Sequence, residues 1–228
     1  MNFISAILDL LFPPKCLFCS KILSGDGYWC EKCAGTLMLT ADGGKQPGEF
    51  YKYCVSPLYY AGLVRKSVLR FKFHGAAMYA DAYGKILASC IRDHIDVKYD
   101  IISWVPLSAK RKRARGYDQA MLLARATAFE LEEELTETLV KKRHVRAQSE
   151  LKGKDERSAN ISGAYEAAAP ELLEGKTVLV IDDIVTTGST LEECAKVLLE
   201  NGAKRVNLLT LARTVSLHSP SIKVESGE

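Results

Sequence analysis

The stretch KTVLVIDDIVTTGSTL, residues 176–191, decides the fold of this chain. It begins with an apolar, largely β-branched run at residues 177–181, which is typical of a buried strand. Two acids, Asp182 and Asp183, end that run, and a turn rich in hydroxyl groups then opens a helix. Ligands of an open parallel sheet bind just beyond the carboxyl ends of its strands. The stretch therefore predicts an α/β fold with a binding site at this turn.

The turn has the composition of a phosphate site. Its members are Thr186, Thr187, Gly188, Ser189 and Thr190. The start of a helix offers unpaired N–H groups and a positive dipole to a phosphate, hydroxyl groups add donors, and a glycine lets the backbone approach closely. The carboxylates of Asp182 and Asp183 are suited instead to accept hydrogen bonds from hydroxyl groups, or to lie near a divalent cation. A phosphate beside sugar hydroxyls indicates a ribose 5-phosphate.

Two other interpretations of the turn are weaker. It contains neither GxxxxGK[ST] nor GxGxxG, so a P-loop nucleotidase and a dinucleotide-binding fold are not indicated. A purely structural strand–turn–helix would need a single capping side chain, whereas this one has two acids, four hydroxyl groups and a glycine. That concentration of polar groups favours a ligand.

A second anion site is predicted after the apolar run at residues 101–105. The basic loop KRKRARG follows at residues 110–116, before another helix. Its place after a parallel strand puts it at the same edge of the sheet, and its arginines have the planar donors that bind a pyrophosphate. These arginines are Arg111, Arg113 and Arg115. Five cations in one loop suit DNA or RNA nearly as well, so both interpretations stay open on the residues alone.

Four of the seven cysteines lie in one short window as two CxxC pairs. They are Cys16, Cys19, Cys30 and Cys33. Two such turns facing each other place four thiolates at the corners of a tetrahedron, which suits Zn²⁺. No histidine or carboxylate completes an open catalytic site nearby, so the sequence predicts a structural zinc. The alternatives are free thiols or a redox pair, but the strand that precedes a thioredoxin-like CxxC is not visible.

The composition is that of a soluble globular protein. The 228 residues are 47% hydrophobic and 26% charged, which excludes a disordered chain, and the net charge of +3 decides nothing about nucleic acid. The sequence predicts an N-terminal helix and zinc module at residues 1–48, a linker at residues 40–49, and an α/β domain at residues 49–228. No apolar run reaches the roughly 18 residues of a membrane helix. An odd number of cysteines without a secretory signal favours the reducing cytoplasm.

Hydrophobic periodicity extends the α/β pattern along the chain. Helices are predicted at residues 63–73, 79–95, 117–135 and 189–201, and further strands at residues 55–60, 140–143 and 205–211. Strands that alternate with helices predict a parallel sheet with helices on both faces. The basic side chains of the first helix are expected on its outer side: Arg65, Lys66, Arg70 and Lys72. The remaining cysteines are expected to be small buried hydrophobes: Cys54, Cys90 and Cys194.

Three of these motifs together resemble a known family. VLVIDDIVTTGST, residues 178–190, resembles the phosphoribosyl pyrophosphate (PRPP) signature of type I phosphoribosyltransferases. With the two CxxC pairs and VPLSAKRKRARGYDQA at residues 105–120, the chain is similar to the ComF family, named for a competence protein of DNA-uptake systems. The resemblance implies a Rossmann-like phosphoribosyltransferase core with an N-terminal zinc ribbon. It also implies Mg²⁺-dependent PRPP binding, with Asp182 and Asp183 facing the ribose hydroxyls.

The resemblance also gives a role to the polar stretch at residues 147–166. Type I enzymes have a flexible loop before the signature, which closes over the transition state and excludes water. Lys152 is the catalytic candidate that this loop offers. The family usually has Phe and Asn where this chain has Tyr117 and Asp118, and Asp118 is expected to cap a helix.

Two functions follow from the resemblance. The first is substitution at the anomeric carbon of PRPP with Mg²⁺-assisted release of pyrophosphate, which requires a pocket for an acceptor that the sequence does not identify. The second is a non-catalytic, PRPP-binding accessory protein that contacts single-stranded DNA or a helicase partner during DNA uptake. That alternative requires a continuous basic surface joining residues 65–72, 110–115 and 141–146.

Overall fold

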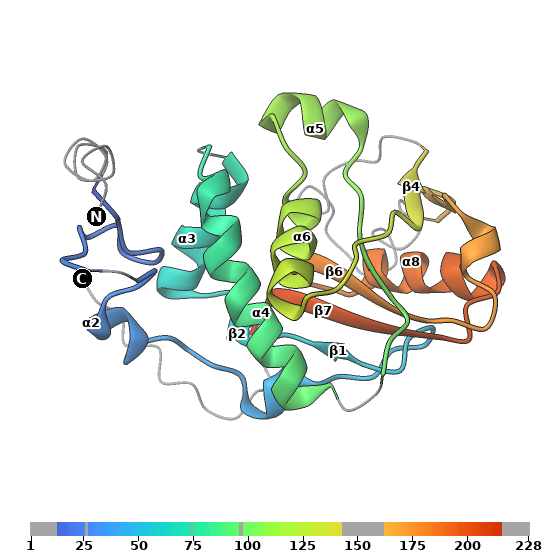
Figure 1. Ribbon diagram of the computed structural model, residues 1–228, viewed down its shortest axis with the longest axis horizontal. Coiled ribbons are helices and arrows are strands. Elements are labelled where there is room, and N and C mark those ends of the chain that lie inside the picture. The colour runs from blue at the N-terminus through green and yellow to red at the C-terminus, as the bar shows by residue number, and fades with distance from the viewer. Residues whose placement is uncertain (1–12, 26, 74, 96–97, 143–161, 216–228) are drawn as a thin grey trace.

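The computed structural model describes residues 13–25, 27–73, 75–95, 98–142 and 162–215. Its centre is a parallel sheet with five strands among these residues (Figure 1). The strands are β1 (Cys54–Val55), β2 (Leu58–Tyr59), β3 (Ile101–Trp104), β6 (Thr177–Val185) and β7 (Arg205–Arg213). Their order is β1–β7–β6–β3, with β2 also paired to β7, and every pairing is parallel. The predicted parallel α/β class is confirmed.

Four of the longer helices cover the two faces of the sheet. They are α3 (Gly62–Phe73), α4 (Ala80–His94), α6 (Gln119–Leu131) and α8 (Ser189–Glu200). Along β6, Leu179 and Ile181 lie in the core formed with α3, α4 and α6, whereas Val178 and Val180 lie in the core formed with α8. A strand buried on both faces needs apolar side chains at every position, which explains its continuous apolar run.

Helices α4 and α6 approach each other closely at Gly84. A Cβ atom at this position would lie 2.6 Å from the Cβ of Ala126 and 2.7 Å from its carbonyl carbon. Real Cβ atoms do not come so near to backbone, so any side chain here would push the helices apart. The glycine therefore fixes the spacing of the two helices that cover this face.

A separate strand pair and several short helices complete the described chain. The pair is antiparallel and consists of β4 (Leu139–Lys141) and β5 (Tyr165–Ala167). The short helices are α2 (Glu31–Ala34) and α5 (Ala109–Arg115), and the 3-10 turns are η1 (Ala41–Gly44), η2 (Ala77–Tyr79) and η4 (Pro170–Leu172). No helix in the described ranges is long and apolar enough to cross a membrane.

Residues 110–115 of the predicted loop form most of helix α5 instead. The backbone N–H of Arg111 donates to Ser108 Oγ at 3.4 Å, so Ser108 caps the start of the helix. Gly116 ends it in the left-handed conformation, with a φ of 84°. Hydrophobic periodicity does not predict this helix, because the residues between its two caps are mostly cations and form no apolar face.

Two predicted boundaries also move. The helix predicted at residues 117–135 ends earlier, because Glu132 takes a left-handed φ of 57°. The strand predicted at residues 177–181 continues through both acids to Val185, which lies opposite Arg213 of β7. The acids therefore stand on the strand itself, and the sheet fixes their backbone.

The segment predicted as a linker, residues 40–49, packs onto the α/β domain. Gln46 and Cys54 exchange two backbone hydrogen bonds of 3.0 and 2.7 Å. Glu192 of α8 accepts the backbone N–H of Glu49 at 3.1 Å. Its glycines and proline indicated a free connection, but the segment pairs with β1 and docks on α8 instead.

Candidate functional site

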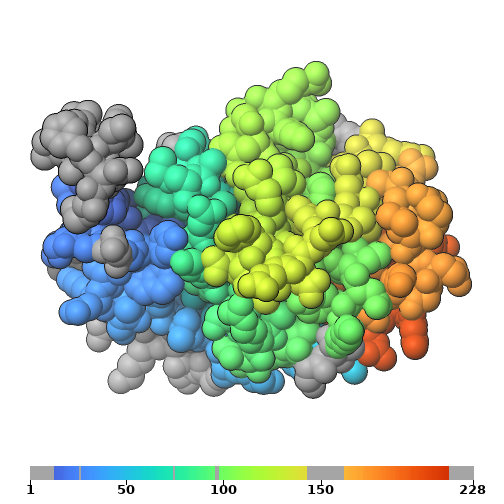
Figure 2. Space-filling view, in the orientation of Figure 1, coloured from blue at the N-terminus to red at the C-terminus, as the bar shows by residue number. Residues whose placement is uncertain are grey.

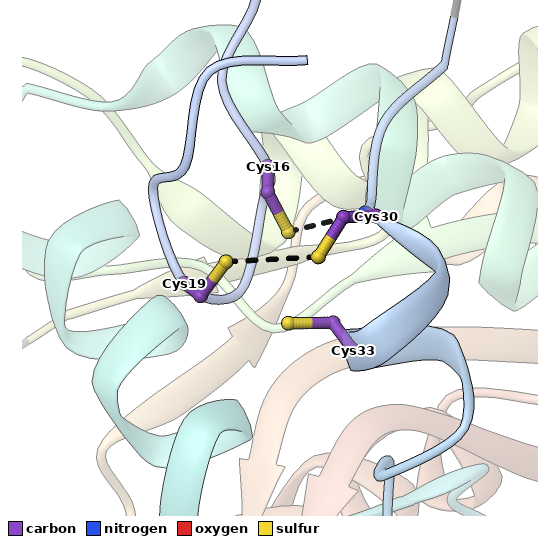
Figure 3. A group of neighbouring side chains, drawn as sticks. All are labelled: Cys16, Cys19, Cys30 and Cys33. Carbon is purple, nitrogen blue, oxygen red and sulfur yellow. Dashed lines mark hydrogen bonds between the residues drawn. The ribbon is translucent and has the colours of Figure 1, made fainter. Parts of the chain in front are cut away.

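The four predicted zinc ligands converge on one point (Figure 3). Their Sγ atoms all lie within 4.8 Å of one another, and those of Cys19 and Cys30 are 3.8 Å apart. A tetrahedral site with Zn–S bonds of about 2.3 Å has sulfur–sulfur edges of about 3.8 Å. The arrangement of Cys16, Cys19, Cys30 and Cys33 therefore fits a structural Zn²⁺, as predicted.

The pKa values of two thiols in this cluster, Cys16 and Cys33, shift in opposite directions. Burial raises the pKa of Cys16, but backbone N–H donors, led by those of Cys19 and Cys30, lower it to about 6. Burial and hydrogen bonds with the other thiols, that of Cys19 first, raise the pKa of Cys33. Zinc binds the thiolate form, so a cation held among the four sulfurs would stabilise Cys33 as a thiolate too.

The acids Asp182 and Asp183 lie next to each other near the carboxyl end of β6. The backbone N–H of Asp183 donates to Asp182 Oδ1 at 2.7 Å. Burial, and then the carboxylate of Asp183, raise the pKa of Asp182 to about 8. Two neighbouring carboxylates repel each other, and a cation or hydroxyl donors relieve that repulsion. The donor set of carboxylate oxygens suits Mg²⁺.

The hydroxyl-rich turn joins this acid pair to helix α8. Gly188 has a φ of 82°, a left-handed conformation in which other residues are strained. Thr187 Oγ1 and Ser189 Oγ are 3.2 Å apart, so the hydroxyl groups gather at the turn. Since α8 begins at Ser189, its first N–H groups also lie here. Strand, acids, turn and helix start thus form one continuous unit.

Lys72, in the last turn of α3, reaches the acid pair. Its Nζ lies 2.9 Å from Asp183 Oδ1, and the two side chains are only 17% and 13% exposed. The prediction that the basic residues of this helix lie on its outer side holds for Arg65 and Lys66, which are exposed. It is wrong for Lys72 and for Arg70, which are partly buried against other parts of the chain.

Helix α5 follows β3 at the same edge of the sheet and separates the three predicted arginines. Arg111 and Arg115 are four residues apart, share one helix face and are partly buried, whereas Arg113 is exposed. The guanidinium of Arg115 lies 4.8 Å from the ring centre of Phe73. Burial lowers the pKa of Arg115, and the carboxylate of Asp183 raises it, so this arginine is within electrostatic reach of the acid pair.

Lys141, at the end of β4, is a site residue that the sequence did not single out. Its Nζ donates to the hydroxyl of Tyr165 at 2.6 Å. Burial lowers the pKa of Lys141 to about 8, while Cys194 and Asp182 act in the opposite direction. In the sequence this lysine is the first of the basic run at residues 141–146, which the accessory-protein alternative places on a continuous basic surface. Its orientation depends on the pairing of β4 with β5, which no local pattern reveals.

The remaining residues with predicted roles are a helix cap, three buried cysteines and the catalytic candidate Lys152. Asp118 caps α6 as expected: its Oδ1 accepts the N–H of Met121 at 3.2 Å. The cysteines expected to be buried are buried: Cys54, Cys90 and Cys194. The predicted catalytic Lys152 lies outside the described residues, as does the rest of the polar stretch up to residue 161.

Two known domain families match separate parts of the sequence. The double zinc ribbon domain matches residues 7–45, and the phosphoribosyl transferase domain matches residues 118–225. The latter match begins at the cap of α6 and includes the acid pair and the hydroxyl-rich turn. The chain is therefore a phosphoribosyltransferase-type α/β protein with an N-terminal zinc ribbon.

Similar proteins narrow the identification from the fold class to a family. It is 30% identical over 208 residues to competence protein F of Haemophilus influenzae, which covers 88% of this chain and 85% of that protein. It is also 30% identical over 160 residues to competence protein ComFC of Bacillus subtilis, covering 68% of this chain and 62% of that protein. Among solved structures, it is similar to glutamine PRPP amidotransferase from B. subtilis, with a TM-score of 0.42 and 20% identity over 62% of this chain and 30% of that one. The chain belongs to the ComF family of competence proteins.

Proposed function

We propose that this protein binds PRPP with Mg²⁺ at the carboxyl edge of β6. The supporting observation is that an acid pair, a hydroxyl-rich helix start and partly buried cations occur together at this edge. Acceptors for sugar hydroxyls and donors for phosphates are thus separated in the way that a phosphorylated ribose requires. The match to the phosphoribosyl transferase domain supports the same ligand.

Each part of the site has a role in this proposal. The turn at residues 186–190 holds the 5-phosphate, and Asp182 and Asp183 accept hydrogen bonds from the ribose hydroxyls. Arg111 and Arg115 bind the pyrophosphate through charge-assisted hydrogen bonds. The partly buried ammonium of Lys141 adds a further positive charge beside them.

The reaction in this proposal is substitution at the anomeric carbon. Pyrophosphate leaves with the bonding electron pair, positive charge develops on the sugar, and an acceptor forms the new bond at that carbon. Mg²⁺, when bound, compensates the charge of the departing pyrophosphate. The side chains contribute by positioning and by electrostatic stabilisation, and the loop with Lys152 is proposed to close over the site.

A second candidate function is an accessory role in DNA uptake without turnover. Its supporting observation is the outward face of α5, where Lys110, Lys112 and Arg113 are all exposed. Such a face suits a phosphate backbone. The basic surface it requires is interrupted, however, because Lys72 and Lys141 are directed toward the interior of the protein.

Calorimetry separates the candidates. PRPP is titrated into the zinc-loaded protein with Mg²⁺, and pyrophosphate release is then screened across nucleobase acceptors. Binding of PRPP with release in the presence of one acceptor supports the transferase. PRPP binding without release, together with salt-sensitive binding of single-stranded DNA, supports the accessory role. Absence of PRPP binding rejects both.

A further inference from the structure

Helix α3 is attached to the zinc ribbon along one of its faces. Arg70 Nη2 donates to the carbonyl oxygens of Leu17 and Phe18, at 2.8 Å each. Ser67 Oγ also donates to the carbonyl of Leu17. Figure 2 shows the blue N-terminal module beside the teal part of the chain to which α3 belongs. Two side chains of α3 thus bind the backbone of one short segment of the ribbon.

That segment is the turn between two zinc ligands. Leu17 and Phe18 are the two residues between Cys16 and Cys19, and both are essentially buried. They share a hydrophobic core with Phe71 of α3. Carbonyls of so short a turn keep their direction only while the cysteines on each side are held, which is the role of a structural zinc.

The opposite face of the same helix carries Lys72. Lys72 is two residues after Arg70, which turns it by about 200° around the helix axis. The zinc ribbon and the acid pair therefore contact opposite sides of one helical turn, as the ion pair of Lys72 with Asp183 at 2.9 Å confirms. Tyr117 fixes this turn from the domain side, because its hydroxyl donates to the carbonyl of Phe71.

We infer that the zinc ribbon positions Lys72 at the acid pair, so that zinc binding and ligand binding are coupled through α3. Lys72 is a positioning residue in this view: it holds the Asp183 carboxylate in place to accept a ribose hydroxyl. Without Lys72, the partly buried carboxylate of Asp183 would lose its ion-pair partner and would be free to rotate. The inference rests on the proposed PRPP site for its ligand, but the contacts that carry it are independent of PRPP.

The first test measures Lys72 itself, without PRPP. A small amine-acylating reagent labels the zinc-loaded protein, and mass spectrometry follows the rate at each lysine. Lys72 should react slowly in the wild type, and exposed Lys66 on the same helix should react fast. Arg70→Met should raise the rate at Lys72 toward that of Lys66, whereas the matched control Arg65→Met should leave it unchanged. Asp183→Asn gives the rate expected when the ion pair is absent.

The second test couples this change to the ligand. Lys72→Met should weaken PRPP binding by about tenfold or more, the equivalent of one charge-assisted hydrogen bond, and Lys72→Arg should recover part of it. Arg70→Met should also weaken binding, but it should have no further effect in a Lys72→Met background. Removing zinc with a chelator should reproduce the effect of Arg70→Met on both labelling and affinity.

The outcomes distinguish the proposed PRPP binding from the proposed positioning of Lys72 by the zinc ribbon. If wild type does not bind PRPP but Arg70→Met still frees Lys72, the proposed function fails, while the positioning of Lys72 by the zinc ribbon stands. If Arg70→Met leaves Lys72 protected in a folded, zinc-loaded protein, or if its effect on PRPP affinity simply adds to that of Lys72→Met, the coupling is wrong. Should Arg70→Met fail to fold, Ser67→Ala removes the other α3 contact with Leu17 and is judged by the same two readouts.

Discussion

The lowered pKa of Lys141 leads to a prediction of how PRPP affinity changes with pH, and of the size of that change. Burial lowers the pKa of its ammonium to about 8, so it loses its charge within an accessible pH range. A bound pyrophosphate stabilises the charged form and raises that pKa. By linkage, the part of PRPP affinity that depends on charged Lys141 should therefore be present below about pH 8 and fall as pH rises. From about pH 7 to about pH 9 the expected loss is about tenfold.

The assay compares the PRPP affinities of wild type and Lys141→Met across this range. The ratio of the two affinities isolates the effect of Lys141 from the effects of other titrating groups. The most important of these is Asp182, whose raised pKa should change PRPP affinity with pH in the opposite direction. Lys142→Met is the matched control, because Lys142 is 55% exposed and pairs with Glu166 at the surface. The advantage of wild type over Lys141→Met should shrink with pH, and Lys142→Met should follow wild type. A ratio that does not change with pH would refute the role given to Lys141.

Three further outcomes are expected. Purified protein should contain about one equivalent of zinc, and Cys33→Ser should lose most of it; a variant that keeps both metal and ribbon fold would contradict the site. Arg115→Ala should weaken PRPP binding far more than ribose 5-phosphate binding, whereas Arg113→Ala should weaken mainly the binding of nucleic acid. If the two variants weakened PRPP binding equally, the assignment of Arg115 to the pyrophosphate would be wrong. Gly84→Ala should destabilise the fold by about 1–3 kcal/mol in denaturant unfolding, because its methyl group would meet Ala126, and an unchanged midpoint would refute this packing argument.

The parts of the fold that the sequence predicted are those with strong local signals. The run at residues 177–181 is apolar at nearly every position because β6 is buried on both faces, and this pattern alone is typical of a parallel strand. The two CxxC pairs likewise specify their ligand by chemistry alone. Helix α5 was missed because nothing in a polar, basic run distinguishes a capped helix from a loop.

The missed site residues have a different cause. Lys72 and Lys141 look like surface lysines in the sequence, and their inward direction comes from tertiary contacts. Asp183 attracts Lys72 across the end of α3, and the pairing of β4 with β5 sets Lys141 against Tyr165. Hydrophobic periodicity contains no information about such charges. Their closeness to the acid pair on β6, which only the assembled fold provides, is what reveals them.

The most direct test of the central claim is PRPP binding by the acid pair. Calorimetry with Mg²⁺ should give saturable binding to wild type and at least about tenfold weaker binding to the Asp182→Asn, Asp183→Asn double variant, since charged hydrogen bonds are lost. Glu133→Gln with Glu134→Gln is the charge-matched control, because both side chains are exposed just after the end of α6, and its affinity should equal that of wild type. Unchanged PRPP affinity in a folded acid-pair variant would contradict the account.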